Sequence, residues 1–213
     1  MRSILLVTAV ATLGFLATAA HADETPGLYR KDRLELSVGE NLGGFSVGPL
    51  SGFTFGGTVQ ARHGFGPVHL TLEGGFYGLS MRKNLSDETA YGGKLTRVGA
   101  AAELHFARFG SKSIGADLYV SGGFGRQMIW WNQGGKLTRP DVSMGLGIRA
   151  LFGIGGSDEK PRVITVDMGV RGLVADAPDL GAGERCSAIC DEVSGPYPYD
   201  LGIFWAMSVG YGW

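Results

Sequence analysis

Residues 203–213 read IFWAMSVGYGW and close the chain of 213 residues. Every second position in this segment is large and apolar: Ile203, Trp205, Met207, Val209, Tyr211 and Trp213. The positions between them are mostly small. Because successive side chains of a strand point to opposite faces, the segment predicts a β-strand with one apolar face.

The same alternation recurs upstream. In residues 68–77, Leu70 and Leu72 alternate with His69 and Thr71. Seven segments follow this rule, at residues 33–39, 53–62, 68–77, 95–106, 116–130, 142–152 and 163–174. With the closing segment they make eight, of roughly 7–15 residues each, and most are long enough to cross a bilayer at a tilt.

The spacers between these segments fall into two classes. Three are short and carry Gly, Pro, Ser or Lys, at residues 63–67, 107–113 and 153–161. Four are longer, at residues 40–52, 78–94, 131–141 and 175–200. Membrane barrels have short periplasmic turns and longer extracellular loops. The alternation of the two classes therefore predicts that the first and last strands have their free ends on the periplasmic side.

The composition narrows the protein class. Glycine supplies 37 residues, and each glycine in a helix costs about 1 kcal/mol relative to alanine, so strands are favoured over helices. Apolar residues make up 44% and aromatic residues 10%, which excludes a disordered chain. The formal net charge is −1 and no long basic run occurs, which argues against nucleic-acid binding.

Residues 1–22 have the layout of a secretory signal peptide. Arg2 supplies a positive charge, residues 4–16 are apolar, and Ala20 and Ala22 precede Asp23. A membrane anchor is the alternative, but the apolar stretch is short and acidic residues follow it directly. We expect cleavage after Ala22 and a barrel domain over residues 23–213.

Alternation alone does not say which face is buried. The apolar face packs inward in a soluble sandwich and meets lipid in a membrane barrel. The signal peptide, the even number of segments, the alternating spacers and the aromatic residues near segment ends favour the second arrangement. The sequence therefore predicts an all-β protein, an eight-stranded antiparallel transmembrane β-barrel. A secreted soluble barrel or sandwich is the alternative.

The closing segment, Ile203–Trp213, resembles the terminal signal of bacterial outer-membrane proteins. In that family the signal is read by the barrel-assembly machinery, which implies such a role for Trp205, Val209, Tyr211 and Trp213. The whole chain after the signal peptide resembles the small eight-stranded barrels of the OmpA and OmpX architectural type. The resemblance implies a monomer in the bacterial outer membrane, in contact with its lipid and lipopolysaccharide.

The polar faces of the segments are expected to line the barrel interior. Such an interior is only wide enough for its own side chains, and an unpaired buried charge is costly. We expect the interior charges to pair as a plug, with a narrow pore for small solutes as the alternative. They are Arg33, Glu35, Glu73, Arg97, Glu103, Asp117, Arg149, Asp167 and Arg171. Arg126 is predicted to face lipid.

The longest spacer, residues 175–200, contains both cysteines of the chain. Cys186 and Cys190 are four residues apart, and an exported protein meets an oxidising compartment, so a local disulfide is expected. A metal site is the weaker alternative, because no histidine lies nearby. The acidic residues of this spacer are expected to form a solvated face, with attraction of divalent cations as the alternative.

An enzyme that modifies lipid A is a further alternative, since some similar barrels use His, Ser and Glu on the outer wall near the extracellular rim. His63, His69 and His105 all fall at the periplasmic end instead, and none has a serine two residues later. We therefore expect no catalysis, no cofactor and no metal. The expected role is structural or interactive, through four surface loops.

Overall fold

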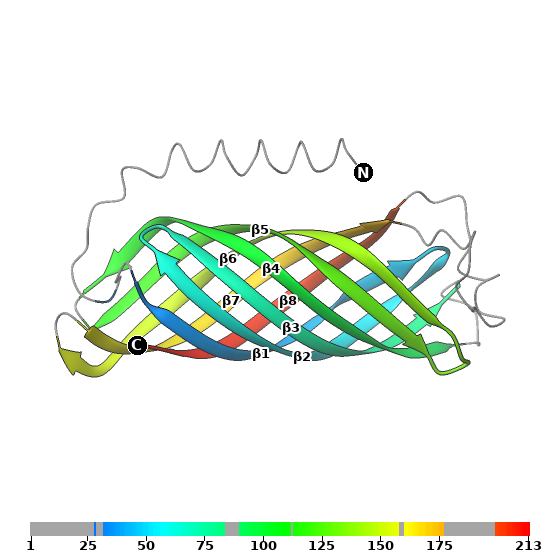
Figure 1. Cartoon of the computed structure of the whole chain (residues 1–213), viewed down its shortest axis with the longest axis horizontal. Helices are drawn as coiled ribbons and strands as arrows, with labels where there is room; N and C mark the ends of the chain where they lie inside the picture. The colour runs from blue at the N-terminus through cyan, green and yellow to red at the C-terminus, as the bar shows by residue number, and fades with distance from the viewer. Residues whose placement is uncertain (1–27, 29–31, 84–89, 112, 158–159, 177–198) are drawn as a thin grey trace.

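A computed structural model describes residues 28, 32–83, 90–111, 113–157, 160–176 and 199–213. These residues form eight strands (Figure 1): β1 (Leu34–Val47), β2 (Leu50–Phe65), β3 (Val68–Arg82), β4 (Tyr91–Gly110), β5 (Ile114–Trp131), β6 (Lys136–Ser157), β7 (Lys160–Asp176) and β8 (Tyr199–Gly212). Within these ranges, no helix is long and apolar enough to cross a membrane.

The strands close into one antiparallel barrel. Each strand pairs with its neighbours in the sequence, and β8 pairs with β1. The predicted eight-stranded antiparallel β-barrel is therefore confirmed. In Figure 1 the ends of β1 and β8 near the C-terminus share one end of the barrel with the tight turns, which we call the turn end. The β1–β2 and β5–β6 connections lie at the opposite end, which we call the loop end.

The strands are strongly staggered. Starting from Glu40 on β1, the register leads through β2, β3 and β4 to Met128 on β5. In the other direction it leads through β8, β7 and β6 to Leu118 on the same strand, ten residues away. With a rise of about 3.3 Å per residue and about 4.8 Å between strands, this stagger tilts the strands by roughly 40°.

The outer wall is apolar and the inner wall polar. On β2, Phe53, Phe55 and Val59 are 71%, 58% and 60% exposed, whereas Thr54 and Arg62 are 1% and 3% exposed. This is the reverse of a soluble sandwich, in which the apolar faces are buried. The wall therefore has the polarity of a barrel surrounded by lipid, as the sequence predicts.

The connections at the loop end are shorter than predicted. Gly48 and Pro49 alone join β1 to β2, where the sequence predicts a long loop over residues 40–52. Gly48 has φ of 57°, a conformation that glycine adopts without strain. The β3–β4 and β5–β6 connections shrink to residues 83–90 and 132–135. The predicted first long loop is thus wrong.

The sequence pattern does not predict the parts of the strands near the loop end, because the inner wall changes there from polar to apolar. Phe45, Val47 and Leu50 point inward there and are at most 3% exposed. The rule of apolar residues outside and polar residues inside therefore fails, although the strands continue. Predictions for residues 1–22 and for the Cys186–Cys190 disulfide lie outside the described residues and stay predictions.

Two outward-facing charges interrupt the apolar wall. Arg126 on β5 is exposed, and the β4–β5 register around it is regular, so no bulge turns it inward. Glu40 is exposed on β1 between its register partners Gly57 and Met207. Glu40 is the seventh of the 14 residues of β1, which places it near mid-height of the wall. Glu40 lies in a predicted loop and was not expected to face lipid.

Candidate functional site

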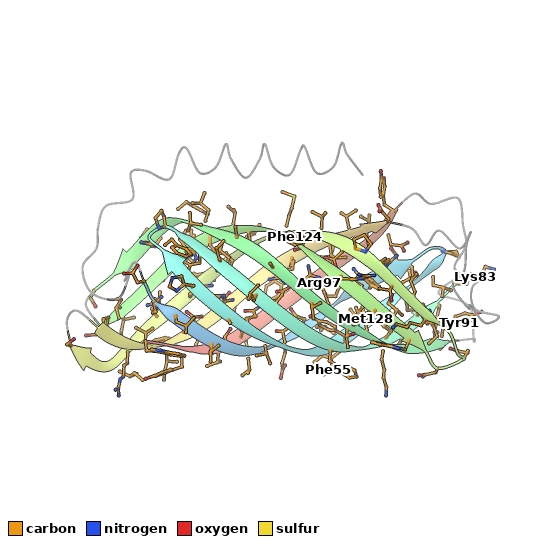
Figure 2. The ribbon with its side chains drawn as sticks, viewed as in Figure 1. Phe55, Lys83, Tyr91, Arg97, Phe124 and Met128 are labelled. Carbon is orange, nitrogen blue, oxygen red and sulfur yellow. The ribbon has the colours of Figure 1, made fainter. Side chains whose placement is uncertain are left out.

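The barrel interior contains two networks of charged side chains. The lower network lies toward the turn end and comprises Arg33, Glu35, Arg62, His69, Glu103, His105, Asp117, Tyr119, Arg149 and Asp167. The upper network lies toward the loop end and comprises Glu73, Arg97, Gln127, Arg139, Asp141, Arg171 and Asp200. Figure 2 shows Arg97 within the outline of the barrel and Phe55 projecting from its edge.

Arg62 on β2 binds carboxylates from three other strands. Its Nη1 lies 2.8 Å from Oε1 of Glu35 on β1, and its Nε lies 3.1 Å from Oε1 of Glu103 on β4. Its Nη2 lies 3.1 Å from Oδ2 of Asp167 on β7. Because β2 and β7 are three strands apart around the barrel, this side chain crosses the lumen.

Arg149 on β6 approaches the same carboxylates from the opposite wall. Its Nη2 lies 2.7 Å from Oε2 of Glu103 and 2.8 Å from Oδ2 of Asp167. Its Nη1 lies 3.1 Å from Nδ1 of His69 and 3.3 Å from Nε2 of His105. Arg149 is 0% exposed. Glu103 and Asp167 are therefore each held by two guanidinium groups, which ties five strands together through the lumen.

His105 is held between Asp117 and Arg149. Its Nδ1 lies 2.8 Å from Oδ2 of Asp117, and its ring stacks on Tyr119 with centroids 5.3 Å apart. An ionised carboxylate only accepts hydrogen bonds, and a guanidinium only donates them. Nδ1–H therefore donates to Asp117 while Nε2 accepts from Arg149. The Tyr119 hydroxyl donates in turn to Oδ1 of Asp167 at 2.5 Å.

A glycine makes room for this stack. Gly147 is the register partner of Tyr119 on β6. A Cβ added at Gly147 would lie 2.5 Å from Cζ and from the hydroxyl oxygen of Tyr119. No side chain fits beside the tyrosine ring in its present position, so the network depends on glycine here.

The donor set His69, Glu103 and His105 has the residue types of a metal site, and its ligand atoms lie within 4.8 Å of one another. Arg149, however, contacts all three of these side chains. The cation that these donors require is thus supplied by the guanidinium. A metal ion would have to displace a side chain that also binds Asp167.

The upper network is balanced in charge within the described residues. Arg97 pairs with Glu73, and its Nη2 lies 2.6 Å from Oδ1 of Asp141. Arg171 on β7 reaches across the lumen to pair with Glu73 on β3. A fourth pair joins Arg139 to Asp200, whose Oδ1 accepts the Gly48 backbone N–H at 2.6 Å. Three arginines therefore face three carboxylates.

An apolar cap closes the interior at the loop end. Val47, Leu50, Met81 and Ile129 are each 0% exposed although they point into the lumen. The cap consists of Phe45, Val47, Leu50, Tyr77, Leu79, Met81, Leu95, Ile129, Trp131, Leu137, Leu173, Ala175 and Phe204. Arg139 of the upper network lies over the ring of Phe45, with its Cζ 5.6 Å from the ring centroid, so the cap and the upper network interleave at the loop end.

The structure places all nine predicted interior charges inside the wall, with Arg171 the most exposed of them at 20% of its side chain. Sequence reasoning put Arg62, His69 and His105 on polar faces without assigning them to the interior charges. Residues 139, 141 and 200 fell in predicted loops. Extending the alternation of each strand past its predicted end is the signal that identifies these three residues as inward-facing. Of the predicted assembly-signal residues, Tyr211 and Trp213 stack with centroids 5.7 Å apart on the outer wall.

The histidines are poorly placed for hydrolytic chemistry. A general base needs a ring nitrogen available to a nucleophile. Both nitrogens of His105 are engaged, and His69 faces Arg149 inside the lumen. His63 packs edge-on against Phe65 with centroids 4.5 Å apart. In the described residues no hydroxyl group bonds to any of the three imidazoles.

Neither a protein-family model nor a curated protein sequence matches the chain. Among solved structures it is similar to Neisserial surface protein A, with a TM-score of 0.51, 12% identity, and coverage of 84% of this chain and 95% of that one. The N-terminal β-barrel domain of Pseudomonas aeruginosa OprF gives a TM-score of 0.47 at 16% identity, covering 86% and 98%. Ail of Yersinia pestis gives 0.44 at 10% identity, covering 86% and 99%.

At 12% identity the likeness to Neisserial surface protein A shows the fold alone. Together with the closed barrel and its apolar outer wall, it confirms the expected architecture. The chain has the fold of a small eight-stranded outer-membrane β-barrel.

Proposed function

We propose that this protein is a non-conducting outer-membrane barrel with a structural or surface-interaction role. In this proposal residues 1–22 direct export and are removed, and the assembly machinery reads the closing strand. The turn end lies in the periplasm and the loop end faces the exterior. The protein then acts through its outer wall and loops, and not through its lumen.

The observation that carries this proposal is the crossing of the lumen by Arg62 and Arg149. Together they contact Glu35, Glu103 and Asp167 at 2.7–3.1 Å. An ion path at this level would have to break these contacts and leave buried charges without partners. Breaking one buried pair by removing a partner typically costs about 3–5 kcal/mol. The upper network and the apolar cap add further contacts that such a path would have to break.

Planar-bilayer recording of the refolded chain from residue 23 onward tests the proposal. A gel-mobility difference between unheated and boiled samples first shows that the barrel has folded. We expect a folded protein that gives no discrete openings. The double variant Arg62→Ala/Arg149→Ala empties the crossing point but leaves the upper network and the apolar cap in place, so it is expected to stay silent as well.

Reproducible openings of the wild-type protein would refute the closed lumen. The narrow-pore alternative predicts in addition that Glu103→Gln or Arg97→Gln changes the conductance or the ion selectivity. The enzymatic alternative makes a different prediction, that expression alters the lipid A of the host. Mass spectrometry of extracted lipid A is expected to show no such change.

A further inference from the structure

Four cationic side chains point outward from neighbouring strands at the loop end. Lys94 on β4 and Lys136 on β6 are the register partners of Trp130 on β5, one on each side. Nζ of Lys136 lies 5.5 Å from the centroid of the Trp130 ring. Arg126 lies four residues below Trp130 on β5, and Arg82 ends β3. We call Arg82, Lys94, Arg126, Trp130 and Lys136 the cationic sector.

The four cations of this sector are exposed, and within the described part of the chain none of them contacts a carboxylate. The remaining wall differs. At the loop end of β7, β8, β1 and β2 the outward positions hold Val174, Asp176, Tyr199, Leu201, Ser46 and Phe53, and none of these is a cation. Positive charge is therefore concentrated on one side of the barrel.

The height of the sector fits a membrane–water interface. Below it the outer wall is apolar, with Val98, Phe124 and Met144 at 54%, 69% and 61% exposure. Tryptophan is enriched at such interfaces, where its ring is apolar and its N–H is polar. Arg126 lies at the upper border of the apolar surface, and its long aliphatic stem lets the guanidinium reach upward to headgroups.

We propose that the cationic sector binds the phosphate groups of lipid A, the membrane anchor of lipopolysaccharide. This rests on the place of the barrel in the outer membrane and is independent of whether the lumen conducts. Guanidinium groups bind phosphate oxygens in pairs, and ammonium groups bind them as point charges. Trp130 offers a flat apolar surface beside the sugar or the upper acyl chains.

The spread of the charges favours lipid A over a lipid with a single phosphate. Lys94 and Lys136 are two strand spacings apart, about 10 Å, and Arg126 is about 13 Å from Trp130 along β5. Lipid A has a phosphate at each end of its disaccharide. One molecule can therefore engage cations at both ends of the sector, whereas one phosphatidylglycerol cannot.

Native mass spectrometry in a zwitterionic detergent tests the assignment with three probes: diphosphorylated lipid A, dephosphorylated lipid A and phosphatidylglycerol. The triple variant Lys94→Gln/Arg126→Gln/Lys136→Gln removes the central charges without touching the interior. We expect its affinity for diphosphorylated lipid A to fall on the order of 100-fold, and that of Arg126→Gln alone on the order of fivefold.

Arg162→Gln is the matched control, because Arg162 is an exposed cation on β7 at the turn end. We expect it to bind lipid A like the wild type. Equal losses in Arg126→Gln and Arg162→Gln, or an unchanged triple variant, would overturn the proposal. Equal affinity for phosphatidylglycerol would overturn the choice of lipid A. The heat-dependent gel shift of each variant shows that the barrel itself is intact, which separates this result from failure of the fold.

Discussion

Replacing Arg149 with methionine is the most direct test of how the interior is held together. The substitution keeps an unbranched side chain of similar length and removes the charge. Arg149 is 0% exposed, and Glu103 and Asp167, which lose this partner, are 2% and 5% exposed. The variant loses the ion pairs to Glu103 and Asp167 and the hydrogen bonds to His69 and His105.

The size of the expected loss in stability follows from the ion pairs that remain in the variant. In Arg149→Met, Arg62 is the remaining partner of Glu35, Glu103 and Asp167 among these contacts, so three carboxylates share one guanidinium. Removing one partner of a buried ion pair costs about 3–5 kcal/mol. We expect the free energy of unfolding to fall by about this amount. Adding Glu103→Gln removes one of the carboxylates that lost a partner. This second substitution is expected to restore about 1–2 kcal/mol of the free energy of unfolding.

Equilibrium unfolding in urea, with the chain from residue 23 onward folded into lipid vesicles, measures these differences. Tryptophan fluorescence follows the transition, and the heat-dependent gel shift gives a second reading of the folded fraction. Arg162→Met is the matched control and should change stability by less than about 0.5 kcal/mol, as exposed substitutions do. A loss below about 1 kcal/mol in Arg149→Met would show that the lower network is not what holds the interior together.

Two further substitutions test the packing and the lipid-facing wall in the same titration. Gly147→Ala is expected to destabilise by about 1–3 kcal/mol, because its Cβ would lie 2.5 Å from the Tyr119 ring. Gly74→Ala, where an added Cβ meets nothing within 4 Å, is the control, and equal losses in the two variants would contradict this reason. Glu40→Leu is expected to stabilise by about 1–2 kcal/mol, because it removes a carboxyl group from the apolar belt. A destabilised Glu40→Leu would mean that Glu40 has a partner in the membrane.

Residues with a clear period of two were read correctly from the sequence. In β3, the alternation of His69, Thr71 and Glu73 with Leu70 and Leu72 gives the strand, its inner face and the charges on that face. Prediction failed where the inner face is apolar. Residues 40–52 contain glycines and inward Phe45, Val47 and Leu50, so neither face stands out and the segment reads as a loop.

The partners of the interior charges could not be inferred in the same way. Arg62 binds Glu103, 41 positions away, and Glu35 accepts from Thr165, 130 positions away. These contacts depend on the ten-residue stagger with which the sheet closes, and no local pattern encodes that stagger. The same holds for the cationic sector, whose members come from four strands.

The sequence by itself determined the eight segments with a clear period of two, their inner and outer faces and the charges that these segments carry inward, because the direction of a side chain from a strand depends only on its position along the chain. The tertiary structure alone decided that Arg149 lies among His69, Glu103, His105 and Asp167, and that the loop end is capped by apolar side chains. Distances across a lumen are fixed by closure and stagger, which are properties of the whole sheet.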